Sequence, residues 1–380
     1  MSRARPWPRV TIGIIGGGQL AKMMVQKGKK MGFTMGVLDP SPGSPAGQIA
    51  DFEIVGGFDE LERLRELAAR CDTLTYDLEH IDVEALRRLQ GEGSDVQPRP
   101  DVLAVVQDKL DQRRFFERAG LPQPRFAECD EPTPAALAEF RFPLVQKLRR
   151  GGYDGRGVAI LRSPEDPPLR GPSVLEELVP IRKELAVIAA RGAEGEIRCY
   201  PPVEMEFDPR ANILDLLLAP ARVPAETAEQ ARELASRAAE ALETLGVLGV
   251  ELFWAEDGRM LLNEVAPRPH NSGHYTWEAC VTSQFEQHLR GVVGLPLGSP
   301  EQMRPAVMLN LLGADASRGP AVVDGFAEAL AVDGVSIHIY GKAETRPFRK
   351  MGHVTVLDED LDRAREKAIQ VKSLLRVRSQ

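Results

Sequence analysis

Cysteine is scarce in this 380-residue sequence and never closely spaced, which argues against a cysteine zinc site and against a disulfide framework. The four cysteines are Cys71, Cys129, Cys199 and Cys280. Zinc sites and disulfide frameworks need cysteines at short or regular spacings. We therefore expect four reduced thiols that belong to neither kind of structure.

Long apolar runs and an excess of basic residues are also missing. No stretch approaches the roughly 20 apolar residues of a membrane span, and the N-terminal segment MSRARPWPRV lacks the apolar run of a signal peptide. The net charge of −8 and the pI near 5.5 argue against binding to a nucleic-acid backbone. Small anionic substrates stay possible, because a site needs only local positive charge. We expect a cytoplasmic protein that binds neither nucleic acid nor membrane.

The histidines do not form a recognisable metal motif. The one close pair, His270 and His274, lies in the segment PRPHNSGH, which proline and glycine interrupt. A zinc pair at this spacing needs a helix and the glutamate of H-E-x-x-H. We expect a metal-free role for this pair, and we expect His80 and His353 to be partly buried, hydrogen-bonded histidines.

Residues 10–100 alternate short β-branched runs with helical patterns. The runs VTIGIIG, TMGVLDP, FEIV and DTLTYDL are separated by helical segments such as 59–70. This alternation predicts an α/β fold with a parallel sheet covered by helices. Residues 91–100 then indicate a connection, and two helices should follow and end at Gly120.

The segment TIGIIGGGQLAKMM joins a strand pattern to a helix pattern through three glycines. Gly16, Gly18 and Ala21 fit G-x-G-x-x-G/A, and Asp39 follows at about the distance of a ribose-binding acid. Glycines at a helix N-terminus let backbone amides approach an anion. The pattern therefore indicates a phosphate or carboxylate site, and leaves open a nicotinamide cofactor, another anion, or a tight turn without ligand.

A hairpin is predicted in GVELFWAEDGRMLLNEVAPR, residues 249–268. Asp257-Gly258 between two apolar runs favours a two-residue turn, in which Glu256 would pair with Arg259. Continuing that register places Glu251 opposite Glu264. Facing carboxylates repel unless a cation lies between them, and Mg²⁺ is usually held by one or two carboxylates together with substrate phosphates. We interpret the two glutamates as a Mg²⁺-nucleotide site; the alternative is a solvated edge of the sheet.

A second glycine-rich segment, QKLRRGGYDGRGV, follows a strand that ends near Lys147. Arg149, Arg150 and Arg156 lie in or beside it. Flexible amides with nearby cations suit a lid over phosphoryl groups. The segment is not a Walker A loop, because no G-K-[ST] follows.

Together these features resemble the ATP-grasp superfamily. Within it, the motifs GGYDGRG, NEVAPRPHNSGH, SQFEQHLR and RPFRKMGH are similar to those of N5-carboxyaminoimidazole ribonucleotide synthases, over residues 10–357. The resemblance implies an ATP-grasp fold with three domains. These are a Rossmann-like preATP-grasp domain at 1–105, an ATP-grasp domain at 106–300 with a lid subdomain at about 125–190, and a small β-rich domain at 301–380.

The resemblance also implies an ATP site. Lys109 and Lys147 would contact ATP phosphates, Glu184 would bind the ribose hydroxyls, and Glu251 and Glu264 would hold Mg²⁺. The remaining ATP-binding positions are Asn263, the lid residues Gly152, Tyr153, Asp154, Gly155, Arg156, Gly157 and Val158, and the adenine hinge Glu176, Glu177, Leu178 and Val179. The chain departs from the family at Phe207, where many members have histidine, and at Leu148, where arginine often follows the strand lysine.

For the acceptor, aminoimidazole ribonucleotide, the resemblance assigns the first glycine turn to its phosphate, so no nicotinamide is implied. The acceptor positions are Gly18, Gln19, Leu20, Glu79, Tyr153, Arg156, Lys342 and Arg349. The catalytic positions are Tyr153, Asp154, Arg156, Arg268, His270, Asn271 and Lys342, among which Arg268, His270 and Asn271 would gather bicarbonate and the transferred phosphoryl group.

The implied activity is ATP-dependent carboxylation of this ribonucleotide by a homodimer in purine synthesis. Bicarbonate would attack ATP to give carboxyphosphate, and a closed lid would protect that intermediate from water. The alternatives are another ATP-grasp carboxylate-amine ligase, a nicotinamide oxidoreductase, and a nucleotide-binding regulatory protein without catalysis.

Overall fold

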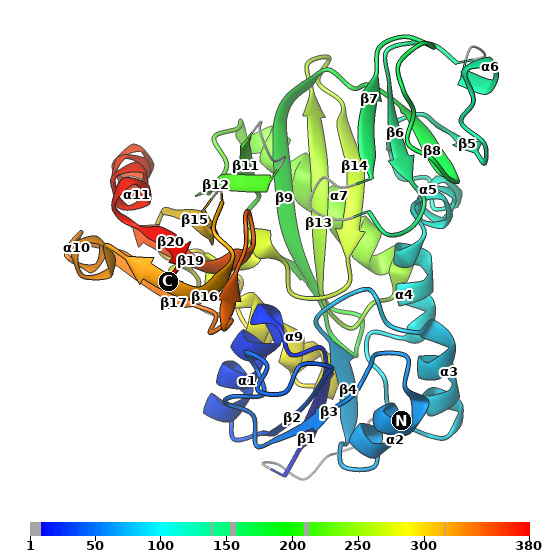
Figure 1. The fold of residues 1–380 in the computed structure, drawn as a ribbon. Coiled ribbons are helices and arrows are strands. Elements are labelled where there is room, and N and C mark those ends of the chain that lie inside the picture. The colour runs from blue at the N-terminus through cyan, green and yellow to red at the C-terminus, as the bar shows by residue number, and fades with distance from the viewer. Residues whose placement is uncertain (1–8, 138–139, 153–156, 209–212, 315) are drawn as a thin grey trace.

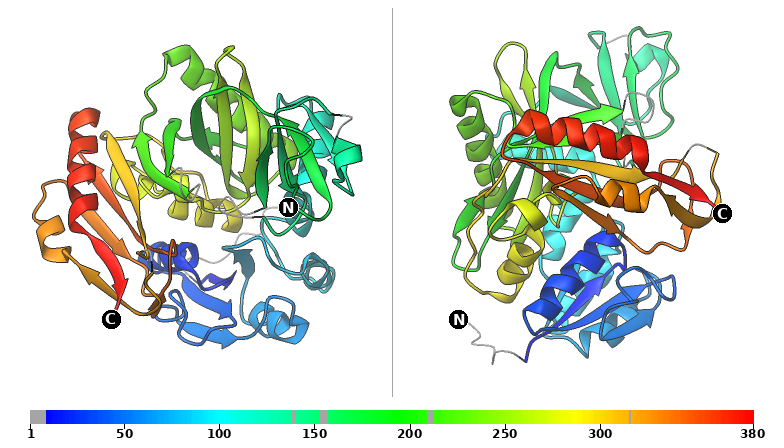
Figure 2. Two further views of the ribbon diagram at one scale, coloured as in Figure 1. Left: turned by 45° about the horizontal axis from the view of Figure 1, so that its top comes forward. Right: turned by 90° about the vertical axis from the view of Figure 1, so that its left-hand side faces the viewer.

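The computed structural model describes residues 9–137, 140–152, 157–208, 213–314 and 316–380. Figure 1 shows a small N-terminal sheet at one end, a long central sheet, and a second small sheet beside the far end of the central one. The N-terminal and C-terminal parts of the chain lie next to each other (Figure 2). None of the helices in these described ranges combines the length and apolar character of a membrane span.

The N-terminal sheet is parallel, as the alternating pattern predicts. Its strand order is β3 (Phe52–Val55), β2 (Thr34–Asp39), β1 (Thr11–Ile15), β4 (Thr73–Tyr76). Ile12, Ile14 and Ile15 of the central strand β1 are all fully buried, which requires cover on both faces. Helices α1 (Gln19–Lys30), α2 (Leu61–Ala68) and α3 (Val83–Gly91) provide cover for this sheet.

Helix α9 (Gln284–Val293) attaches the N-terminal sheet to the rest of the molecule. Its Phe285 and Leu289 belong to the same apolar cluster as Ile12 and Met35. The His288 ring is buried and lies 2.8 Å from the Thr75 hydroxyl on β4. A helix remote in sequence therefore completes the cover of the N-terminal domain.

The central sheet is antiparallel and runs from the hairpin into the C-terminal part of the chain. Its order is β14 (Met260–Ala266), β13 (Gly246–Ala255), β9 (Ile181–Arg191), β11 (Val203–Asp208), β12 (Ile213–Ala219), β15 (Ala306–Leu312), β19 (Lys350–Leu357), β17 (Val335–Ile339), with β10 (Ile197–Cys199) paired to β9. Pairing of β12 with β15 makes the third region continuous with this sheet. The Ala-rich helix α7 (Ala225–Leu242) packs its buried alanines against β9.

The second small sheet, which we call the lid sheet, has the order β5 (Phe126–Cys129), β8 (Ser173–Glu177), β6 (Leu144–Leu148), β7 (Val158–Leu161). The two helices expected before Gly120 are α4 (Pro100–Gln107) and α5 (Lys109–Arg118). Helix α5 lies close to both β8 and the hairpin. The lid sheet and the central sheet thus face each other across the N-terminal end of α5.

The remaining elements are short or lie at the C-terminus. They are α6 (Pro134–Leu137), η1 (Asn271–Gly273), α8 (Thr276–Ala279), α10 (Phe326–Leu330), α11 (Leu361–Leu374), and the three-stranded sheet β18 (Glu344–Thr345), β16 (Gly319–Asp324), β20 (Arg376–Ser379). Helix α11 covers the C-terminal half of the central sheet.

The predicted hairpin exists, but its two-residue turn is wrong. The amide of Ala255 donates to the carbonyl of Arg259 at 2.9 Å, so residues 256–258 form a three-residue loop, with Gly258 at φ +88°. A bulge between Glu251 and Leu252 then takes up one extra residue, Asn263, on the facing strand. The two differences cancel, and Glu251 does pair with Glu264 as predicted.

Candidate active site

A cavity of about 670 Å³ lies between the lid sheet and the central sheet. Pockets of this size suit a nucleotide or other small ligand. The predicted site residues that line it are Glu79, Lys109, Lys147, Gly152, Val158, Glu176, Glu177, Leu178, Val179, Glu184, Glu251, Asn263, Glu264, Arg268, His270 and Asn271. Residues more than 150 positions apart in sequence thus converge on one space.

Two lysines from different elements, helix α5 and strand β6, line the cavity. Lys109, the first residue of α5, places its Nζ 2.7 Å from Glu264 Oε2. Lys147 on β6 places its Nζ 2.9 Å from Glu176 Oε2 and donates at 2.9 Å to Asn263 Oδ1. Both cations are held by acidic or amide groups of the cleft, which gives the site fixed positive charge where an anionic ligand would lie.

The facing glutamates are electrostatically coupled. Lys109 holds the pKa of Glu264 well below its usual range, whereas burial and the negative charge of Glu264 raise the pKa of Glu251. Burial likewise raises the pKa of the nearby Glu184 to about 7. Three carboxyl groups in one cleft with only partial neutralisation form a site that would gain stability from an added cation.

The β-bulge places Asn263 and Glu264, consecutive residues of β14, on the same side. The contacts of Lys147 with Asn263 and of Lys109 with Glu264 both face the cavity. Without the bulge the two side chains would alternate across the sheet. The irregularity that the sequence did not predict therefore doubles the number of polar groups that this strand presents.

Oxygen donors suited to Mg²⁺ come from Glu251, Glu264 and the Asn263 carbonyl. Mg²⁺ commonly takes one or two carboxylates and completes its shell with water and phosphate oxygens. Glu251 and Glu264 face each other across the hairpin, and burial together with the charge of Glu264 raises the pKa of Glu251, so a cation between the two carboxyl groups would relieve their repulsion and these residues fit the ion. In the described ranges no three His, Cys, Asp or Glu side chains gather as a metal site by themselves.

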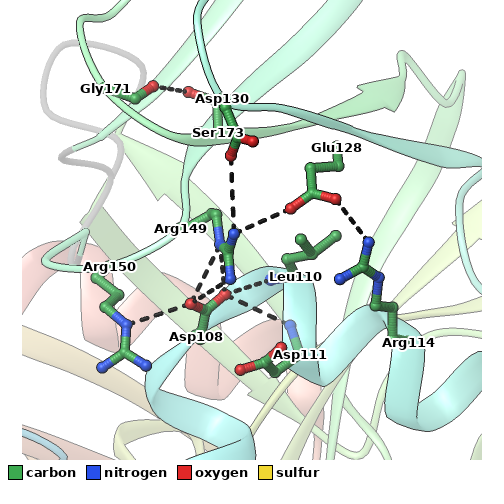
Figure 3. A network of polar contacts seen from close by, with 10 residues as sticks. All are labelled: Asp108, Leu110, Asp111, Arg114, Glu128, Asp130, Arg149, Arg150, Gly171 and Ser173. Carbon is green, nitrogen blue, oxygen red and sulfur yellow. Dashed lines mark hydrogen bonds and ion pairs between the residues drawn. The ribbon is translucent and has the colours of Figure 1, made fainter.

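The start of the lid loop is fastened to helix α5 (Figure 3). Asp108 caps α5 by accepting from the Leu110 and Asp111 amides, and it also accepts from Arg149 Nε at 3.1 Å and Arg150 Nε at 3.2 Å. The Lys109 amide donates to the Arg149 carbonyl at 2.9 Å. The two arginines line the cavity, but their guanidinium groups are paired with protein carboxylates here.

The centre of the predicted lid, Tyr153, Asp154, Gly155 and Arg156, lies outside the described residues. Its flanks are described: Gly152 and Val158 line the cavity, and Gly157 does not. Gly157 has φ +74°, a conformation that favours glycine.

One wall of the cavity is apolar and includes Ile160 and Leu178, both large and exposed, together with Phe253. Phe207, the departure from the family pattern, also lines the cavity. Glu177 differs from its neighbour Glu176, because its carboxylate pairs with Arg125 and Arg259. Such a wall, next to polar groups of the 176–179 segment, suits a flat aromatic base.

At the other end of the cavity a second polar group forms. Arg268 Nη2 lies 2.6 Å from Glu79 Oε1, and its buried Nε has no hydrogen-bond partner among the described residues. His270 lies between Ser272, at 2.8 Å from Nδ1, and Glu251, at 3.4 Å from Nε2. Asn271 exchanges two hydrogen bonds with Asn310, which the sequence did not single out.

The first glycine turn is occupied by the protein's own carboxylates. The Gly17 amide donates to Asp39 at 2.8 Å, and the Gly18 amide donates to Asp77 at 2.9 Å. A Cβ on Gly16 would lie 1.8 Å from Asp77 Oδ1, and Gly16 has φ +103°. Gly18, Gln19 and Leu20 do not line the cavity, and the Leu20 side chain is part of the apolar core.

Lys342 and Arg349 also lie away from the cavity wall. Lys342 Nζ donates to the Lys350 carbonyl at 2.7 Å, and Arg349 Nη1 donates to the Glu344 carbonyl at 2.6 Å. Their segment is nevertheless adjacent to α1, because Lys22 Nζ donates to the Tyr340 carbonyl at 2.9 Å. Lys350, which the sequence analysis did not select within RPFRKMGH, lines the cavity.

The histidines outside the cavity are structural. His353 is fully buried and its Nδ1 lies 3.0 Å from the Tyr340 hydroxyl, as expected for a hydrogen-bonded core histidine. The His274 ring packs against the His353 ring, with 4.6 Å between the ring centroids. His80 is exposed and lines the cavity, so the expectation of a partly buried histidine is wrong at this position.

Comparison with protein families divides the chain into three matched segments. Residues 9–107 match the ribonucleotide synthetase preATP-grasp domain, residues 114–285 match the ATP-grasp domain, and residues 306–367 match the phosphoribosylaminoimidazole carboxylase C-terminal domain.

Curated relatives and solved structures agree with these matches. The chain is 39% identical to N5-carboxyaminoimidazole ribonucleotide synthase of Bacillus subtilis over 95% of each sequence. It spans 65% of the plant phosphoribosylaminoimidazole carboxylase of Vigna aconitifolia, at 40% identity over 93% of this chain.

Among solved structures, N5-carboxyaminoimidazole ribonucleotide synthetase of Thermotoga maritima is 50% identical, with a TM-score of 0.91 over 98% of this chain and 100% of the other. The Aspergillus clavatus synthase in complex with ADP and 5-aminoimidazole ribonucleotide is 34% identical, with a TM-score of 0.89 over 97% and 99% of the two chains. This agreement covers all three matched segments. The chain therefore belongs to the N5-carboxyaminoimidazole ribonucleotide synthase family of ATP-grasp ligases, which act in purine biosynthesis.

Proposed function

We propose that the cleft uses ATP and bicarbonate to carboxylate 5-aminoimidazole ribonucleotide, giving N5-carboxyaminoimidazole ribonucleotide, ADP and phosphate. The observation that carries this proposal is the convergence of Lys109, Lys147, Glu251 and Glu264 in one cavity. Solved relatives support it, since Aspergillus clavatus synthase structures are described as complexes with ATP and with ADP plus the ribonucleotide.

In the first step a bicarbonate oxygen attacks the γ-phosphorus of ATP, and the bond from that phosphorus to the ADP oxygen breaks. Lys109 and Lys147 would balance the phosphate charge, and the apolar wall with Phe253 and Leu178 would hold the adenine. Glu184 would accept from the ribose hydroxyls. We propose that Glu251 and Glu264 hold Mg²⁺, which when bound neutralises charge on the transferred phosphoryl group.

In the second step carboxyphosphate breaks to CO₂ and phosphate, and the exocyclic amine of the acceptor bonds to the carbon and loses a proton. Arg268, His270 and Asn271 would surround the carboxyphosphate. Their position at the cavity supports this assignment, because the Arg268 guanidinium carries charged donors suited to an anion. A closed lid formed by 152–158 would keep water away from the intermediate.

The acceptor is proposed to extend from Glu79 toward the first glycine turn. The Gly18 amide is taken by Asp77, so the phosphate would rely on the first-turn amides of Gln19 and Leu20, which have no acceptor within their own helix. Lys342 and Arg349 would approach from the C-terminal segment, which contacts α1 through Lys22. We also propose a cytoplasmic homodimer, which light scattering would test by its mass.

The direct test measures ADP release with MgATP and bicarbonate, with and without the ribonucleotide. Release that depends on the ribonucleotide, with carboxylated product detected by mass, supports the proposal. Release without it, or release that needs an amino acid or peptide acceptor, would point to another ATP-grasp ligase.

A further inference from the structure

Arg113 is a buried cation that lies behind the cleft and does not line it. It belongs to α5, one turn after Lys109, and its side chain is 4% exposed. Buried arginines are uncommon and need several partners. Arg113 has them: Nε lies 2.8 Å from Glu176 Oε1, and Nη1 donates at 2.9 Å to the Leu262 carbonyl and at 3.4 Å to Gln123 Oε1.

These contacts join the two sheets that enclose the cavity. Glu176 is on β8 of the lid sheet, whereas Leu262 is on β14 of the central sheet. A planar guanidinium with its donors in a fixed fork can hold two such acceptors in a constant relation, which a flexible ammonium cannot. Arg113 therefore sets the position of β8 relative to β14 at the depth of the cleft.

The same two strands carry both groups that hold the Lys147 ammonium. Its Nζ lies 2.9 Å from Glu176 Oε2, the oxygen that Arg113 leaves free, and 2.9 Å from Asn263 Oδ1, on the residue after Leu262. Lys109 differs, because its partner Glu264 makes no ion pair with an arginine among the described residues. The position of Lys109 therefore depends on a carboxylate that contacts it alone, whereas the position of Lys147 depends on a carboxylate that Arg113 also holds.

We propose that Arg113 is a positioning residue for the ATP reaction, which fixes Lys147 against the nucleotide phosphates by bridging Glu176 to β14. The inference rests on the proposed function, because it assumes that Lys147 contacts ATP. Without the bridge, Glu176 keeps its charge but loses its orientation, and the Lys147 ammonium follows it. Misplacement of a group by about 1 Å can cost a reaction about 10²-fold in rate.

The test compares Arg113→Met and Arg113→Lys with the wild type. Arg113→Met should lower kcat/KM for ATP by about 10²-fold and weaken ADP binding, while KM for the ribonucleotide changes less than about twofold. Arg113→Lys keeps the charge but can reach fewer acceptors, so its kcat/KM for ATP should lie between those of the wild type and Arg113→Met. Arg114→Met is the matched control, because Arg114 is on the same helix with an exposed side chain paired to Glu128; it should behave as wild type.

A double-mutant cycle with Lys147→Met separates positioning from general damage. If Arg113 acts through Lys147, adding Arg113→Lys to Lys147→Met should cause almost no further loss. The proposal would be overturned if Arg113→Lys lowered kcat/KM for ATP equally in the wild type and in Lys147→Met. Equal increases of KM for ATP, bicarbonate and the ribonucleotide would also overturn it. If Arg113→Met fails to fold, the Arg113→Lys cycle decides the matter alone.

Failure of the proposed function would look different. A wild-type protein that binds ADP but does not turn over with the ribonucleotide would contradict the function, and ADP affinity would still test Arg113. Unchanged ADP affinity and unchanged kcat/KM in both Arg113 variants would contradict the inference while wild-type turnover upheld the function.

Discussion

The first glycine turn and the cleft between the sheets both look like anion sites in sequence, but the molecule uses them differently. At the turn, Asp39 and Asp77 accept from the Gly17 and Gly18 amides, so the protein supplies its own hydrogen-bond acceptors. In the cleft, Lys109 and Lys147 face a cavity and share it with carboxylates that remain incompletely neutralised. The Gly17 and Gly18 amides of the turn are thus already taken by the protein itself, whereas the lysines of the cleft face an open cavity.

A local sequence motif therefore specifies the backbone geometry of a site better than it specifies which group, ligand or protein side chain, binds there. Three glycines predict accessible amides, yet an acid 59 residues later reaches the Gly18 amide. The cleft is built from strands and a helix that come together only in the tertiary fold. Each prediction below perturbs one of these two regions, or a buried group outside both.

Glu264→Gln should have the largest effect on the reaction. Loss of this carboxylate removes a proposed Mg²⁺ ligand and the partner of Lys109, so kcat should fall by about 10²- to 10³-fold. Steady-state ADP release measures it. Glu256→Gln in the exposed hairpin loop is the control, and a similar loss there would show that the effect is not specific to the cleft.

Gly16→Ala should be the most damaging single change at the turn. The added Cβ would lie 1.8 Å from Asp77 Oδ1, and φ +103° is unfavourable for alanine, so the free energy of unfolding should fall by about 2–4 kcal/mol. Thermal or urea unfolding measures the change. Gly91→Ala, at the end of α3 with open space around it, should be neutral or slightly stabilising; equal destabilisation in both variants would refute the close-packed turn.

The buried histidines should make stability depend on pH below neutrality. Burial lowers the pKa of His274 and His353 well below normal, and that of His288 to about 3. The unfolded chain therefore binds more protons below pH 6.5, so stability is full above that pH and falls as the pH drops toward 3. Each histidine contributes up to about 1.4 kcal/mol per pH unit.

Comparing the unfolding free energy of wild type and His353→Gln between pH 7 and pH 4 isolates one of these contributions. The variant should show a shallower pH dependence. An identical slope would mean that His353 does not titrate differently in the folded state.

At the first glycine turn we expect no binding of a nicotinamide cofactor. Asp39, the candidate ribose-binding acid of a nicotinamide site, already accepts from the Gly17 and Ser41 amides. Fluorescence titration with NADH and NADPH should show no binding. Saturable binding would mean that the turn can exchange its own carboxylate for a cofactor, and would remove the contrast with the cleft.

Much of the fold follows from local patterns. The alternation in 10–100 gave the parallel sheet, and helix-stop signals gave α4 and α5, because periodicity and capping act over a few residues. The Glu251–Glu264 pairing was predicted correctly, but only because a three-residue loop and a bulge compensate. Neither irregularity has a strong sequence signal.

The cleft was less accessible to sequence reasoning from residues alone. The facing glutamates and the strand lysine carried a physical argument, whereas most other positions came from the family resemblance. Arg113 was missed, because the burial of its charged side chain depends on Glu176 and Leu262, which are 63 and 149 residues away. Lys350 was missed as well, although it belongs to the motif RPFRKMGH. Asp108 had a usable signal as an N-cap before an apolar residue, but its contacts with Arg149 and Arg150 exist only in the folded chain.

The most direct measurement is calorimetric titration of ADP with and without Mg²⁺, into wild type and into a Glu251→Gln/Glu264→Gln double variant. ADP should bind at least about tenfold more tightly with Mg²⁺ in the wild type, and its affinity for the double variant should not depend on Mg²⁺. Equal affinity with and without Mg²⁺ in the wild type, or a Mg²⁺ dependence that survives in the double variant, would contradict this prediction.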